Sequence, residues 1–104
     1  MAEIPVSMFL NNGRLDFSPN PVRVNPGDIV TWISRDGEDL KVEFPSQNNP
    51  FAPVTTFVGA KGQATPGGTV RKDVADPKHF ECTVTLGGKV FHHASGVDTP
   101  GPKK

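Results

Sequence analysis

Residues 15–33 constrain the fold of this chain more than any other stretch, because they hold two short apolar runs joined by a tight turn. The runs are residues 21–24 and 29–33, and residues 25–28 read Asn-Pro-Gly-Asp. Proline presets one turn dihedral, glycine accepts a positive φ, and Asn and Asp side chains satisfy nearby backbone groups. The stretch therefore predicts two strands around a turn, with Trp32 on the inward face of the second strand.

The clearest alternation of apolar and polar side chains lies in residues 80–86. Gly87 and Gly88 follow, and this pair predicts a two-residue hairpin, because both positions of such a turn accept a positive φ. Residues 89–93 then return as the antiparallel partner strand. If the pairing continues without irregularity, Cys82 stands opposite His93 on the inner side.

Turn-forming residues are frequent, with eleven Gly and eleven Pro in 104 residues. No segment shows the apolar stripe of an amphipathic helix, and about eight short strands separated by turns indicate an all-β sandwich. A chain of this length forms one domain. We assign residues 1–98 to a single β-sandwich domain. Residues 99–104 have no apolar pattern and are expected to form a flexible C-terminal tail.

The charge balance excludes some classes of partner. Eleven Lys and Arg face eleven Asp and Glu, so the chain has no net field that would attract nucleic acid. No apolar run reaches the length of a membrane span or a signal-peptide core. The chain is therefore either cytoplasmic or an exported protein without its leader. Its single cysteine excludes an internal disulfide.

Three short motifs carry a resemblance to a known family. The Phe-Ser-Pro segment at residues 17–19, the Pro-Gly-Asp turn at 26–28 and the Val-Thr-Trp strand at 30–32 are similar to the opening half of cupredoxins. This Greek-key sandwich family includes plastocyanin and pseudoazurin, and the resemblance covers residues 8–90 as an order of elements. It implies a Greek-key β-sandwich of about 7–8 strands and, if a leader was removed, a periplasmic or exported protein. An immunoglobulin-like sandwich is the alternative fold.

The copper site of that family is not matched in this sequence. Type 1 copper takes two imidazoles and one thiolate, usually with a weak axial methionine. Leu40 stands where the family has its first histidine, and Val84 where it has its cysteine. Gly87 and Gly88 replace the loop that carries the other ligands, and Met8 lies in the first expected strand. The resemblance therefore implies a copper-free member, and we predict no cofactor.

Cys82 and His93 are the remaining candidates for a metal site or a catalytic pair. Two ligands on a strand pair do not make a closed metal site, which usually takes three or four. A Cys–His nucleophile needs an exposed thiolate of low pKa and a group that orients the imidazole. An inward cysteine in an alternating strand packs instead as a small apolar side chain. We therefore predict no catalytic residue and no metal site.

The sequence favours a non-catalytic, copper-free binding or interaction module with an unknown protein partner. Two alternatives stay open: an electron-transfer copper protein with an altered site, and a thiol-dependent enzyme that uses Cys82 and His93. Residues 45–66 form the longest irregular region. Phe51 and Phe57 within it predict either a lid over one end of the core or a protein contact site, and their apolar character favours the lid.

Overall fold

The residues that the structure describes form eight strands and one short 3-10 helix. The computed structural model describes residues 3–19, 22–51, 54–72 and 78–99. In chain order the elements are β1 (Glu3–Asn11), β2 (Arg14–Ser18), β3 (Ile29–Ser34), β4 (Leu40–Glu43), η1 (Ser46–Asn48), β5 (Thr56–Gly59), β6 (Gly68–Thr69), β7 (Lys78–Leu86) and β8 (Lys89–Thr99).

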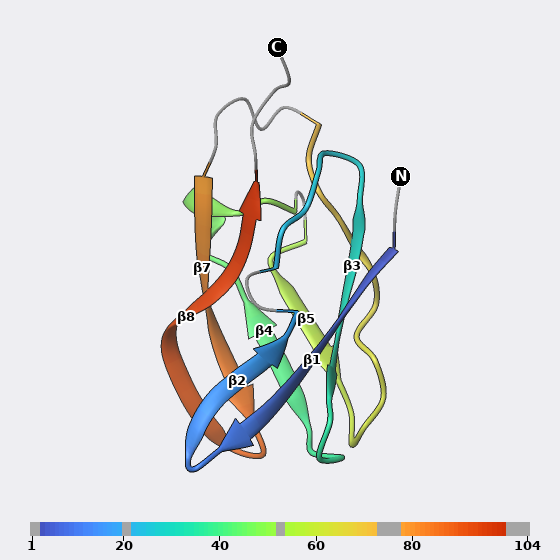
Figure 1. Cartoon of the computed structure of the whole chain (residues 1–104). Coiled ribbons are helices and arrows are strands. Elements are labelled where there is room, and N and C mark those ends of the chain that lie inside the picture. Colours follow the sequence, from blue (N-terminus) through green and yellow to red (C-terminus); the bar gives the residue numbers. More distant parts are fainter. Residues whose placement is uncertain (1–2, 20–21, 52–53, 73–77, 100–104) are drawn as a thin grey trace.

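The strands form two packed four-stranded sheets, which confirms the predicted all-β sandwich (Figure 1). The first sheet has the order β2-β1-β3-β6 and the second has the order β5-β4-β7-β8. No helix in the described ranges is long and apolar enough to cross a membrane. The sandwich has two lateral sides: β2 and β8 are the edge strands of one side, and β6 and β5 are those of the other.

In the first sheet β1 is a central strand. It pairs in parallel with β3, placing Val6 beside Trp32, and antiparallel with β2. Asn12 and Gly13 join β1 to β2, and both have a positive φ, 54° and 79°. These dihedrals belong to the two-residue hairpin turn that Asn-Gly sequences favour, because its twist matches that of the strands.

In the second sheet β7 and β8 form the longest hairpin. Gly87 and Gly88 have φ values of 59° and 86°, which confirms the predicted two-residue turn. The pairing of Cys82 with His93 is wrong: Cys82 lies opposite Ala94, because the register shifts between Cys82 and Val84. His93 has a φ of 56°, a conformation that does not fit a regular ladder and that places the extra residue in a β-bulge.

The core lies between the two sheets and consists of the inward side chains of both. Trp32 has no exposed surface, which confirms the burial predicted from the alternation of residues 29–33. The fully buried large side chains are Trp32, Phe51, Phe57, Phe80, Met8, Leu40, Leu86, Val6, Val22, Val24, Val30 and Val42.

Several element boundaries differ from the sequence expectation. Strand β5 was not expected, because it lies within residues 45–66, which were expected to be irregular, and β6 has only two residues, Gly68–Thr69. The apolar run at residues 21–24 contains no regular strand in its described part, where Arg23 makes one parallel bridge to Asp98. Strand β8 runs on to Thr99, so that residue belongs to the sandwich. The rest of the expected tail, residues 100–104, lies outside the described residues.

Candidate functional site

The Cys82 thiol lies in the core. Its side chain points inward from β7, only 3% of the residue is exposed, and it makes no disulfide. Burial raises the pKa of Cys82 from 9.0 to about 12, and the negative charge of neighbouring Glu81 acts in the same direction. At neutral pH this group is therefore a thiol, not the thiolate that nucleophilic attack or metal binding requires.

His93 is on the surface of β8, whereas the Cys82 thiol is in the core. Its side chain is 85% exposed, and its Nδ1 lies 3.5 Å from a carboxylate oxygen of Glu81. The bulge in β8 turns His93 out of the ladder and moves Ala94 opposite Cys82. Cys82 and His93 both line a second, shallower pocket, but the thiol is buried and His93 Nδ1 faces Glu81, so neither group is prepared for metal binding or for nucleophilic attack.

The two positions that the sequence resemblance would match to copper ligands lie in the core. Leu40 and Val84 are buried core residues, with 1% and 0% exposed surface. They carry no donor atom, and Cys82 beside them is a buried thiol of raised pKa. Copper chemistry has no suitable donor set at this place.

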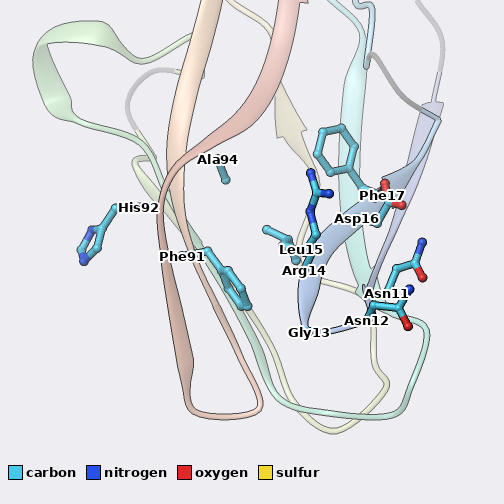
Figure 2. Close-up of a pocket in the computed structure, with 10 residues that line it drawn as sticks. All are labelled: Asn11, Asn12, Gly13, Arg14, Leu15, Asp16, Phe17, Phe91, His92 and Ala94. Atoms are coloured by element: carbon cyan, nitrogen blue, oxygen red, sulfur yellow. Dashed lines mark hydrogen bonds between the residues drawn. The ribbon is translucent and has the colours of Figure 1, made fainter.

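The other histidines have different surroundings. His79 Nδ1 contacts the Asp98 carboxylate on the neighbouring strand. His92 is exposed on β8 and points away from the sandwich in Figure 2. Within the described residues no group of three or more His, Cys, Asp or Glu side chains is close enough to hold a metal ion.

The irregular region at residues 45–66 contributes core, as the lid interpretation predicts. Phe51 and Phe57 are 1% and 2% exposed, and their ring centroids lie 5.5 and 5.0 Å from that of Trp32. The buried Asn49 positions Phe51, because its Oδ1 accepts the Phe51 N–H at 2.9 Å. Its Nδ2 also donates to the Val54 carbonyl at 2.8 Å. Asn49 is a positioning residue that sequence reasoning missed.

The side of the sandwich bounded by β6 and β5 is closed. Thr65 and Trp32 exchange two hydrogen bonds across it: Trp32 N–H donates to Thr65 Oγ1 at 3.0 Å, and Thr65 N–H donates to the Trp32 carbonyl at 2.8 Å. Gly68 of β6 lies so close to Phe57 that a Cβ on it would meet the ring at 2.6 Å. Among the described residues, this side is therefore filled by side chains and backbone.

The opposite side, between β2 and β8, is open. A groove of about 720 Å³ runs between these two edge strands, with half-buried and buried apolar side chains along its floor (Figure 2). The residues that line it are Asn11, Asn12, Gly13, Arg14, Leu15, Asp16, Phe17, Phe91, His92 and Ala94. Sequence reasoning missed this groove, since it depends on how the two sheets separate.

The groove begins where the segment that contains Val22 and Val24 leaves the edge of β8. Near the end of β8 the edge is covered: Val24 N–H donates to the Asp98 carbonyl at 2.9 Å, and Asp98 N–H donates to the Val22 carbonyl at 2.7 Å. Strand β2 belongs to the other sheet, so no described segment continues this pairing along residues 89–94. The groove is the space between the edges of the two sheets that these hydrogen bonds to Asp98 leave uncovered.

Arg14 is the charged group without a partner in this groove. Figure 2 shows its guanidinium extending along β2, above Leu15 and toward the Phe17 end of the groove. It makes no ion pair or hydrogen bond with any residue that the structure describes. Asp16 also lines the groove, but its Oδ1 already accepts the Phe17 N–H at 3.0 Å.

The comparisons with known proteins assign no family. No protein-family model matches the chain, and no curated protein matches it either.

Proposed function

We propose that the protein is a non-catalytic, copper-free binding module on a cupredoxin-like sandwich, with a protein as its partner. The observation that carries the proposal is the position of Cys82. Its thiol is enclosed in the core with a raised pKa, while His93 stands on the surface beyond a bulge. The open groove between β2 and β8 adds support, because apolar surface that a fold leaves unfilled is typical of contact sites.

Both alternatives require what this geometry does not offer. An electron-transfer copper protein needs a thiolate and imidazoles around one metal ion. A thiol-dependent enzyme needs an accessible thiolate within hydrogen-bond reach of its histidine. The burial of Cys82 and the displacement of His93 argue against each of them.

Addition of copper(II) to the metal-free protein tests the copper-free half of the proposal. We expect no intense visible charge-transfer band, and the same spectrum for Cys82→Ser as for the parent protein. A strong blue band that disappears in Cys82→Ser would establish a thiolate–copper bond and overturn this half.

The binding half is tested by selection from a displayed library of random linear peptides. The native protein is immobilised as bait, and the same protein held in denaturant is the matched control. We expect peptides that bind only the native bait. A selection that enriches nothing over the control counts against a function in protein binding.

A further inference from the structure

We propose that the groove between β2 and β8 binds an extended peptide segment that carries apolar side chains and one carboxylate, which pairs with Arg14. This inference rests on the proposed binding function and gives it a site and a partner class. It joins three features of one place: two unpaired strand edges, an apolar floor and an unpartnered guanidinium.

The strand edges supply backbone hydrogen-bonding groups. Alternate residues of an edge strand direct their N–H and C=O groups away from the sheet, where another strand can pair with them. Within the described chain, β2 pairs only with β1, and residues 89–94 of β8 pair only with β7. An extended segment in the groove therefore finds main-chain partners along one of its walls, which is the usual basis of peptide recognition by strand addition.

The floor supplies apolar contacts. Leu15, Phe91 and Ala94 are partly buried and pack against the core from the groove side, and Phe17 closes the inner end. A peptide strand places every second side chain on the same face. The five residues of β2 span about 17 Å at roughly 3.4 Å per residue, so a segment of similar length covers this floor.

Arg14 supplies charge selectivity. A guanidinium presents paired N–H donors that match both oxygens of a carboxylate. Arg35 on the same sheet is already engaged, since its guanidinium stacks 3.9 Å from the Phe9 ring centroid. Arg14 has no described partner, and the neighbouring Asp16 carboxylate disfavours a second anion close to β2. One carboxylate beside apolar residues is the composition that complements the groove.

The position of binding is tested with peptides from the displayed library, synthesised singly and titrated into the ¹⁵N-labelled protein. We expect the enriched sequences to alternate apolar residues with at least one Asp or Glu. We expect the amide resonances of β2 and of residues 89–94 to shift, and their hydrogen exchange to slow, since the edge groups become paired. Shifts confined to other surfaces would overturn the groove while leaving the binding function intact.

Charge is tested with Arg14→Glu, matched by Lys72→Glu, which makes the same charge change at an exposed residue outside the groove. We expect Arg14→Glu to weaken binding of an acidic peptide about tenfold or more, and Lys72→Glu to weaken it by less than about twofold. Equal effects of the two variants would show that Arg14 makes no specific contact.

Steric access is tested with Ala94→Phe, matched by Ala60→Phe at an exposed position on the other side of the sandwich. We expect Ala94→Phe to abolish binding while the circular dichroism spectrum stays unchanged, and Ala60→Phe to bind normally. If Ala94→Phe unfolds, Ala94→Leu repeats the test with a smaller side chain. Sedimentation velocity of the parent protein tests whether a second copy of the chain fills the groove instead. If the parent is a dimer and Ala94→Phe makes it a monomer, the groove is a dimer interface and the peptide-binding proposal is wrong.

Discussion

The two lateral sides of the sandwich differ in packing: one is closed by side chains and a loop, and the other is open. On the side of β6 and β5, a loop lies across the sheets, Thr65 is hydrogen-bonded to Trp32, and Gly68 lets Phe57 pack against the backbone. On the side of β2 and β8, the sheets part and leave Leu15 and Phe91 half exposed along a groove.

This difference indicates that the closed side contributes mainly to stability and the open side to binding. Large aromatic side chains bury the most apolar area, and a side that holds several of them contributes most of the packing energy of a small domain. Half-buried apolar residues beside unpaired strand edges contribute less to folding and keep surface available for a partner. We therefore expect substitutions on the closed side to change stability strongly, and those on the open side to change binding.

The largest effect is expected for Trp32→Ala. Trp32 is fully buried and touches three phenylalanine rings, at centroid distances of 5.0 Å for Phe57, 5.5 Å for Phe51 and 6.0 Å for Phe44. Removing it should lower the free energy of unfolding by about 3–5 kcal/mol, a large share of the roughly 5–15 kcal/mol that stabilises an ordinary domain. Urea unfolding followed by circular dichroism measures the loss.

Trp32→Phe is the matched control for this prediction. The indole Nε1 has no hydrogen-bond partner among the described residues, so the phenyl ring loses volume but none of the described hydrogen bonds and should cost clearly less than the alanine. In the parent protein, tryptophan emission should be blue-shifted and protected from iodide. A red-shifted emission that iodide quenches readily would show that Trp32 is exposed to solvent, which contradicts the tight packing of this side.

The second effect concerns the reactivity of Cys82. Raising the pKa of the thiol from 9.0 to about 12 lowers the thiolate fraction near pH 8 by about a thousandfold. Labelling by a disulfide reagent such as DTNB should therefore be slow in the native protein and fast once urea unfolds it. Native labelling as fast as that of a small free thiol would contradict the core assignment of Cys82 and revive the catalytic alternative.

The same pKa shift predicts a pH dependence of stability. The unfolded chain loses its thiol proton near pH 9 and the folded chain only near pH 12, so the unfolded state binds fewer protons between these values. The stability that Cys82 contributes is complete below pH 9 and falls by about 1 kcal/mol per pH unit above it. Cys82→Ala is the control, and urea midpoints measured from pH 8 to pH 11 should decline less steeply for it than for the parent.

The sequence predicts the strands that have a clear residue pattern. It does not predict features that depend on contacts between residues far apart in the chain. Residues 80–86 alternate strictly, residues 29–33 form an apolar run after a clear turn, and both are strands with the expected inward faces. Strand β5 was missed because its four residues follow a proline-rich loop and carry one buried aromatic, Phe57. Intrinsic preference is a weak signal for such a short strand, and tertiary packing decides it.

The candidate site shows the same limit. The burial of Cys82 follows from the alternation of apolar and polar residues in its strand. The position of His93 outside the regular pairing depends on a β-bulge that no residue pattern predicts. The groove depends on the segment that holds Val22 and Val24 against β8 and then departs from it. Contacts between elements far apart in sequence fix both features, and a single sequence does not encode them in any local period.

The third effect is expected for Gly68→Ala on the closed side. A Cβ at Gly68 would meet two atoms of the Phe57 ring at 2.6 and 2.7 Å, and Phe57 is itself enclosed by Trp32 and Phe51. Overpacking of this kind should cost about 1–3 kcal/mol of unfolding free energy. Gly67→Ala is the neighbouring control: its Cβ would meet the Ile29 Cγ2 methyl at 2.6 Å, but Ile29 is half exposed rather than enclosed by aromatic rings, so it should cost less. Equal losses would contradict the claim that the aromatic packing is tight.

The smallest effect is expected for Phe91→Ala on the open side, with Phe57→Ala as its matched partner on the closed side. Both residues are phenylalanines in strands of the second sheet, but Phe57 is 2% exposed and Phe91 is only partly buried against the core. Phe57→Ala should cost about 3–5 kcal/mol, as a buried phenylalanine does, because the enclosed rings around it cannot close the cavity. Phe91→Ala leaves its gap open to solvent and should cost about 1 kcal/mol. Urea unfolding of both variants gives the comparison directly. If Phe91→Ala costs as much as Phe57→Ala, the β2–β8 side is as tightly packed as the other, and its groove is not a surface held open for a partner.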